Sequence, residues 1–412
     1  MEDPDGSGKQ HLVSRAGKRR CIQASDHQSG VKFLAEWSGD IENQEIHDSP
    51  CIRQLFYAAY EAVGLIENLP RAVSKAPVCI LWRLSPEWSL CFSSNHIHLA
   101  ATDDAGLDAI EAMLDACPSM LESSKKNTDS DMDYSPQHEC KKTAGERYKE
   151  QVRKLKSWIA AGDVFQANIA RFWSMPYPES GLESLYGRLR RVNPAPFSCY
   201  VRVGDDKEEM HILSASPERL FRIDADGGID TRPIAGTRRR GEGEGDTALR
   251  DEMLLSDKER AEHIMLVDLE RNDLGRVCIP GSVEVNESMV VEAYATVQHI
   301  VSNVRGRLRE GLNLVDVFRA MFPGGTITGC PKVRCMEIIH QMEQRARGPY
   351  TGGIGFIACD GSADMNILIR SFWHHAGELH WAAGAGIVAD SDPDHELIET
   401  EHKAEGLLRA LL

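Results

Sequence analysis

Three charged residues near the C-terminus have spacings that place them on one face of a helix. In DPDHELIETEHKAEG, Glu396 and Glu399 are three residues apart, and Lys403 follows four residues after Glu399. Residues three and four apart are neighbours on a helical surface. The letters HELIE match part of the zinc pattern H-E-x-x-H, but Glu399 replaces the second histidine. Oxygen ligands of this kind suit Mg²⁺; a solvated charged face is the alternative.

A third carboxylate, Glu262, lies in ERAEHIMLVDLERNDLGR, one turn before an apolar stripe formed by Met265, Leu266 and Leu269. The density of charged residues beside that stripe permits a buried polar network, in which every charge needs a partner. In isolation Glu262 would be a surface residue. It becomes a candidate metal ligand only together with the carboxylates of the last helix.

Two glycine-rich segments could bind an anion through main-chain N–H groups: FPGGTITGCPK at Phe322–Lys332 and WAAGAGIV at Trp381–Val388. Neither matches the phosphate-loop pattern G-x-x-x-x-G-K-[ST]. Between them, Arg370 in MNILIRSFW falls in an apolar run, where a guanidinium needs a carboxylate partner from the protein or from a ligand. His299 in TVQHIVSNVRG is either a hydrogen-bonded core residue or a proton shuttle.

The elements that must position these residues form groups of strands followed by groups of helices. We expect a helix over Leu55–Leu69, a capping box at Thr143 and Glu146, and helices over Ser256–Asp273 and Asp394–Leu412. Strands are predicted at Val78–Trp82, Ile97–Ala100, Val164–Arg171, His211–Ser214, Leu220–Ile223, Tyr350–Ala358, Met365–Trp373 and Glu378–Ala383. This grouping favours an α+β fold with large antiparallel sheets.

We divide the chain into a divergent N-terminal segment over 1–50, a first part of the sheet scaffold over 51–121, an exposed loop or linker marked by its composition over 122–142, and a region over 143–412 that carries the candidate catalytic residues. The length of 412 residues and 42% hydrophobic residues allow a large core.

Charge and cysteine usage exclude several classes of function. The net charge of −16 disfavours nucleic acid as a partner. We find no apolar run long enough to cross a membrane and no secretory signal, so we expect a cytoplasmic protein. The 11 cysteines show no C-x-x-C pair, which argues against a disulfide framework and a structural zinc site.

Five segments in this order resemble the chorismate-utilising enzyme family: PIAGTRRRG, AEHIMLVDLERNDLGR, PGGTITGCPKVRCMEII, the GAG loop and HELIETEHKA. The resemblance implies antiparallel sheets packed as a sandwich with helices outside, and a Mg²⁺ ion held by Glu262 and Glu399 with Glu396 in support. His299 resembles the residue that assists departure of the C4 hydroxyl or moves a ring proton. The resemblance assigns chorismate binding to Thr326, Tyr350, Arg370, Gly384, Ala385, Gly386, Lys403 and Gly236.

Two further positions bear on the reaction type. Relatives that add water to chorismate have a lysine base where this chain has Gln166, and an amide cannot take a proton. The resemblance therefore implies amination with ammonia, normally supplied by a glutamine amidotransferase subunit. Segments such as NPAPFSCYVRV resemble the aminodeoxychorismate synthase branch, whose product leads to para-aminobenzoate and folate.

Ala235 favours the anthranilate synthase branch, because many aminodeoxychorismate synthases have a nucleophilic lysine at this position. A non-catalytic chorismate-binding subunit is the alternative from another class. The charged residues present at the proposed site favour an enzyme.

Overall fold

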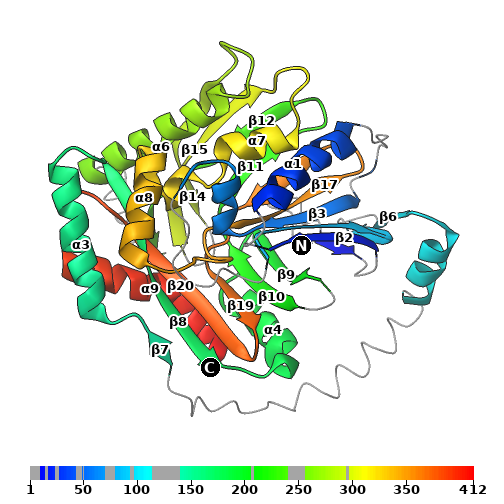
Figure 1. The fold of residues 1–412 in the computed structure, drawn as a ribbon, viewed down its shortest axis with the longest axis horizontal. Coiled ribbons are helices and arrows are strands. Elements are labelled where there is room, and N and C mark those ends of the chain that lie inside the picture. Colours follow the sequence, from blue (N-terminus) through cyan, green and yellow to red (C-terminus); the bar gives the residue numbers. More distant parts are fainter. Residues whose placement is uncertain are drawn as a thin grey trace.

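The described part of the chain folds into large antiparallel sheets with helices around them (Figure 1). The computed structural model describes residues 10–13, 17–23, 27–42, 49, 51–69, 79–92, 97–113, 140–205, 208–239, 256–293 and 297–412. No helix within these ranges is long and apolar enough to cross a membrane.

The larger sheet has ten strands in the order β13-β15-β12-β11-β18-β17-β3-β4-β2, with β14 paired to β15. It therefore joins strands from both ends of the described chain. Its strands are β2 Gly17–Ile22, β3 Ile52–Ala58, β4 Leu81–Pro86, β11 Arg219–Ile223, β12 Gly228–Thr231, β13 Ile234–Arg239, β14 Glu284–Ala293, β15 Val297–Arg307, β17 Gly353–Ala358 and β18 Ala363–Asn366.

The second sheet has seven strands in the order β16-β8-β20-β19-β10-β9, with β7 paired to β8. These strands are β7 Lys141–Lys142, β8 Gln166–Pro176, β9 Phe197–Gly204, β10 Glu209–Ser216, β16 Gly329–Cys330, β19 Ser371–His375 and β20 Glu378–Ile387. A three-stranded sheet is formed by β1 Gln10–Val13, β5 Trp88–Phe92 and β6 Ile97–Ala101.

The two large sheets pack against each other through one apolar core. Tyr57 and Trp82 of the ten-stranded sheet share a cluster with Phe172, Ile212 and Trp373 of the seven-stranded sheet. Strands that contribute to such an interior alternate inward and outward side chains. The prediction of an α+β fold with a sandwich of antiparallel sheets is confirmed.

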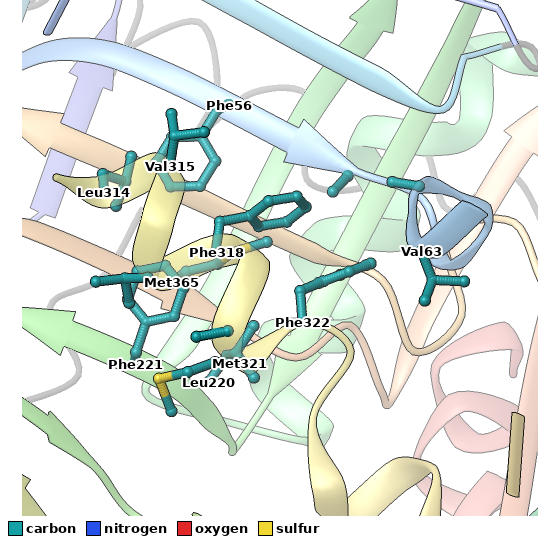
Figure 2. Packing of buried hydrophobic residues seen from close by; sticks show 14 of the residues in the cluster. Phe56, Val63, Leu220, Phe221, Leu314, Val315, Phe318, Met321, Phe322 and Met365 are labelled. Carbon is teal, nitrogen blue, oxygen red and sulfur yellow. The ribbon is translucent and has the colours of Figure 1, made fainter. Parts of the chain in front are cut away.

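Helices cover the outer faces of the sandwich. Figure 2 shows Leu314, Val315 and Phe318 of one covering helix packed against Phe56 and Phe221 of the ten-stranded sheet. The helices are α1 His27–Glu42, η1 Tyr60–Leu65, α3 Gly145–Ala160, η2 Glu179–Gly181, α4 Leu182–Val192, α6 Asp257–Gly275, α7 Leu314–Met321, η3 Gly325–Ile327, α8 Lys332–Glu343 and α9 Pro393–Leu411.

The prediction of a helix over Leu55–Leu69 was wrong. Strand β3 (Ile52–Ala58) occupies the start of this run, and only the short 3-10 helix η1 (Tyr60–Leu65) follows it. β3 lies between β17 and β4, and its residues are almost all buried. A strand covered on both faces reads as a continuous apolar run, so hydrophobic periodicity cannot distinguish it from a helix.

The predicted strand Met365–Trp373 is two strands that belong to different sheets. β18 ends at Asn366 and β19 begins at Ser371. Arg370 lies in the connection with φ +51°, outside the strand conformation that was predicted for it. A non-glycine residue in the left-handed region is strained, and such strain is common at functional sites.

Two predictions around residue 143 also need correction. Thr143 does not cap α3, because its hydroxyl accepts a hydrogen bond from Phe172 N at 3.2 Å, and Ala144 occupies the N-cap position without a side-chain bond. Most of the predicted linker 122–142 lies outside the described residues. Its last two residues, Lys141 and Lys142, form β7 and pair with β8.

Candidate functional site

The glycines of β20 lie against side chains of β8 and α6. Gln166 is 3% exposed, and its Nε2 donates to Glu262 Oε1 at 2.7 Å. A methyl group on Gly386 would lie 2.1 Å from that nitrogen and 3.4 Å from the Glu262 oxygen. Only glycine at position 386 therefore lets the amide and the carboxylate approach this strand.

Two residues further along the same face of β20, Gly384 has a similar role. A methyl group there would lie 2.6 Å from Asn168 Oδ1 and 2.7 Å from the Tyr350 hydroxyl. Lys403 of α9 donates from Nζ to Gly384 O at 3.1 Å and forms an ion pair with Glu399 at 2.7 Å. The predicted neighbours Glu399 and Lys403 thus meet Gly384, which lies in strand β20 (Glu378–Ile387) and not in a loop as the glycines suggested.

Ala385 points away from this face. Its side chain is fully buried in the cluster that contains Tyr148 of α3 and Cys335 of α8. Successive side chains of a strand point to opposite faces, so the methyl of Ala385 cannot share a ligand with Gly384 and Gly386. Any contact of Ala385 with a substrate would have to come from its main chain.

Glu218, in the turn between β10 and β11, is a site residue that sequence reasoning missed. It is 6% exposed, and the Thr326 hydroxyl donates to its Oε1 at 2.5 Å. Burial raises the pKa of Glu218 to about 7, against the opposing effects of the Thr326 hydrogen bond and of the charges on Lys403 and Arg370. A single acidic residue between two apolar strands, in SASPERLF, is the signal that could have revealed it.

Arg370 lies close enough to Glu218 and Tyr350 for their charges to act on it, although burial is the main cause of its lowered pKa. It makes no ion pair with any residue that the structure describes. The strained backbone at this residue therefore presents a half-buried guanidinium suited to a carboxylate.

His299 lies on β15 and is 6% exposed. Burial lowers its pKa to about 4, and the positive charge of Arg370 acts in the same direction. The main chain of Gly236 hydrogen-bonds the ring and opposes this shift. The imidazole is therefore neutral at pH 7 and can accept a proton.

Gly236 stands at a bulge in the pairing of β13 with β15, where its φ is +71°. The residue before it, Ala235, pairs with Ile300 through the backbone, whereas the side chain of Ala235 lies outside the described part of the chain. The bulge brings the Gly236 main chain to His299.

The carboxylates that could hold a metal come from two helices. Glu259 precedes Glu262 by one turn on α6, as Glu396 precedes Glu399 on α9; Glu259 was not among the predicted residues. Burial raises the pKa of Tyr148 on α3, and the charges of Glu396 and Glu399 add to that effect. Among the described residues, no three His, Cys, Asp or Glu side chains already form a metal-binding group.

These residues come from segments that are far apart in sequence but meet around the neighbouring strands β8 and β20. In Figure 1, β8 and β20 lie beside α8 and α9. The family description of a chorismate binding enzyme matches residues 6–409. The chain belongs to the chorismate binding enzyme family.

Several relatives support this assignment. An anthranilate synthase component I-like protein from Synechocystis is 41% identical over 366 residues, which are 87% of this chain and 72% of the relative. Aminodeoxychorismate synthase component 1 from Bacillus subtilis is 48% identical over 64% of this chain and 55% of its own length. Anthranilate synthase component 1 from Haloarcula marismortui is 48% identical over 65% of this chain and 53% of its own length. The matched part is thus about half of the latter two.

The solved structures agree. Anthranilate synthase component I from Streptococcus pneumoniae superposes with a TM-score of 0.79 and 28% identity, over 97% of this chain and 92% of that chain. The family match extends from residue 6, ahead of the region in which the sequence motifs were found. The protein is therefore a chorismate-utilising enzyme, and its relatives divide between two named activities.

Proposed function

We propose that this protein is aminodeoxychorismate synthase component I, which replaces the C4 hydroxyl of chorismate with ammonia to give 4-amino-4-deoxychorismate for para-aminobenzoate and folate synthesis. The observation that carries the amination step is the amide of Gln166 beside Glu262. An amide cannot remove a proton from water, but its carbonyl can accept an N–H.

The neighbouring amide on β8 supports this reading. Gln166 Oε1 and Asn168 Oδ1 are buried and have no hydrogen-bond partner among the described residues. They are two residues apart and therefore on one face of the strand, beside Gly386 and Gly384. A buried acceptor without a donor is costly, and an ammonia molecule brings N–H donors of the required kind.

Glu262 and Glu399 would hold Mg²⁺, with Glu259 and Glu396 in support. Their oxygen-only chemistry fits Mg²⁺, which commonly uses one or two carboxylates and completes its shell with water and substrate oxygens. Two protein carboxylates would therefore suffice to hold the ion. When bound, the ion would neutralise and orient the ring carboxylate of chorismate.

Protein side chains would bind the rest of the substrate. Arg370 offers a guanidinium that no described residue pairs with, and Tyr350 and Thr326 lie beside it around Glu218. Gly384, Gly386 and the Gly236 bulge leave room for a ring close to the backbone. The acidic chain thereby places positive charge at its site for an anionic substrate.

Two titratable groups suit the proton transfers. With its pKa raised to about 7, Glu218 is about half protonated near pH 7, so it can donate a proton as the C4–O bond breaks and the hydroxyl leaves as water. The resulting carboxylate can take the proton that the attacking nitrogen loses. His299 is neutral at that pH and can move a ring proton.

The ammonia would come from a glutamine amidotransferase subunit in the cytoplasm. The names of the relatives support a second component, because they are called component I or component 1. The purified chain should then use added ammonium salt without its partner.

Anthranilate synthase component I is the second candidate. Ala235 favours it, because an alanine methyl cannot form the covalent bond to C2 that a lysine would form before ammonia reaches C4. The relative from Haloarcula marismortui named anthranilate synthase component 1 also favours it. Ammonia added at C2 would give anthranilate after loss of pyruvate.

Product analysis separates the two candidates. The protein is incubated with chorismate, Mg²⁺ and an ammonium salt, with and without aminodeoxychorismate lyase, and products are identified by chromatography and mass. We expect a product that the lyase converts to para-aminobenzoate. Fluorescent anthranilate, formed without the lyase, would assign the chain to the second candidate.

A further inference from the structure

A buried ion pair lies directly behind the proposed substrate residues. Glu343 at the end of α8 is 5% exposed, and Arg347 is 1% exposed. Arg347 donates from Nε to Glu343 Oε2 at 2.9 Å and from Nη2 to Oε1 at 2.7 Å. This two-bond geometry fixes both side chains, because Nε and Nη2 each bind a different oxygen of the carboxylate.

The pair takes the place of a neighbouring strand along part of β8. β16 pairs with β8 only at Gly329 and Cys330, and Thr328 O then accepts from Asn168 N at 2.9 Å. Beyond that point, Asn168 O accepts from Arg347 Nη2 at 2.8 Å, and Ala170 N donates to Glu343 Oε1 at 3.0 Å. The side chains thereby satisfy main-chain groups that would otherwise be left unpaired inside the protein.

Arg347 also holds the two segments that carry Thr326 and Tyr350. Its Nη1 donates to Ile327 O at 3.1 Å and to the Thr351 hydroxyl at 3.2 Å. The same hydroxyl donates to Tyr350 O at 2.5 Å. One guanidinium therefore links η3, strand β8 and, through the Thr351 hydroxyl, the backbone of Tyr350.

Residues of η1 hold the arginine from the other side. Glu61 accepts from Arg347 N at 2.7 Å and from Gly348 N at 3.1 Å, and Tyr60 N donates to Gly348 O at 2.9 Å. The Tyr60 ring lies 4.8 Å from the guanidinium, a distance suited to a cation–π contact. The N-terminal part of the chain thus supports the segment that ends at Tyr350.

We propose that Glu343 and Arg347 are positioning residues that set where Tyr350 and Thr326 meet chorismate. This inference rests on the proposed role of those two residues as substrate contacts. The pair itself touches no substrate. Its loss should therefore change chorismate binding more than ammonia use.

The test compares Arg347→Lys with the wild type and with Arg83→Lys. Lysine keeps the charge but loses the planar fork. Arg83 is a matched control, because it is 7% exposed, pairs with Asp40 and lies on β4, away from the site. Calorimetric Kd for chorismate with Mg²⁺, KM for chorismate and for ammonium, kcat and the melting temperature are measured for each protein.

For Arg347→Lys we expect the Kd and KM for chorismate to rise, kcat/KM to fall by about a hundredfold, and the KM for ammonium to stay the same. Arg83→Lys should lower the melting temperature without changing the Kd. If Arg347→Lys only lowers the melting temperature and keeps the wild-type Kd, the positioning role is wrong.

A milder variant keeps the test decisive if Arg347→Lys does not fold. Thr351→Val removes one acceptor of Arg347 and the donor to Tyr350 O, and should raise the Kd by about threefold. An unchanged Kd in folded Thr351→Val would overturn the proposal. Because Kd is measured without turnover, a wild-type protein that binds chorismate but does not aminate it would refute the proposed function and leave this test in force.

Discussion

Two buried glutamates differ in the number of hydrogen-bond donors around them, and this difference suits one to a structural role and the other to proton transfer. Glu343, behind the site, is held by two bonds from Arg347 and one from Ala170 N. Glu218, at the site, receives one hydroxyl bond from Thr326 on Oε1, and burial raises its pKa to about 7. The carboxyl of Glu343 is thus held by several donors and connects main-chain segments, whereas the carboxyl of Glu218 has one side-chain donor and can exchange a proton near neutral pH.

The largest effect is expected from removing the carboxylates of α6 and α9 that are proposed to hold the metal. Glu399→Ala or Glu262→Ala should abolish Mg²⁺-dependent turnover with the fold intact, because each removes a carboxylate proposed to hold the ion. Product formation is measured over a range of Mg²⁺ concentrations, with circular dichroism as a control for folding. A near-normal rate in either variant would refute the metal assignment.

The next largest effect concerns Glu218 directly. Glu218→Gln keeps the size of the side chain and removes its acidic proton, so kcat should fall by about 10²–10⁴. Steady-state kinetics with saturating chorismate and ammonium measures this change. If the variant keeps the kcat of the wild type, Glu218 is only a structural residue, and the proposed difference in role between Glu218 and Glu343 is wrong.

The pH dependence follows from the same group. Because the raised pKa of Glu218 in the free protein is about 7, its protonated form is lost as pH rises through that value, and kcat/KM should decline on the alkaline side. The residual rate of Glu218→Gln should lack this decline. An alkaline decline that persists in the variant would assign the titration to another group.

The two glutamates should contribute differently to the free energy of unfolding. Glu343→Gln leaves Arg347 without its buried partner and should lower the free energy of unfolding by about 3–5 kcal/mol.

Glu218 has a pKa above the ordinary value of 4.5, so the folded wild type binds more protons than the unfolded chain between that value and about 7. Its stability should therefore fall with rising pH over this window relative to Glu218→Gln. Denaturant titrations at pH 5 and pH 8 measure both effects.

Features with fixed local spacing could be predicted from the sequence. The four-residue step from Glu399 to Lys403 predicted neighbours on a helix, and the structure pairs them at 2.7 Å. The glycines at 384 and 386 predicted close approach to the backbone, and the structure places Tyr350 and Gln166 against them. Both features depend on geometry within a few residues.

Features that depend on distant segments could not be predicted in the same way. Glu218 becomes a site residue only because Thr326 reaches it from 108 positions later in the chain. Arg370 looked like part of a strand because its neighbours are apolar, yet the chain changes sheets at that residue. β3 was mistaken for a helix because both of its faces are covered by elements remote in sequence.

The proposed amination is tested most directly by identifying which atoms enter chorismate. The protein is incubated with chorismate, Mg²⁺ and ¹⁵N-ammonium in ¹⁸O-water, and the product is analysed by mass spectrometry. We predict a product that contains one ¹⁵N and no added ¹⁸O, because Gln166 cannot activate water. A product that carries ¹⁸O and no nitrogen would show that the site adds water, and would contradict the proposed amination.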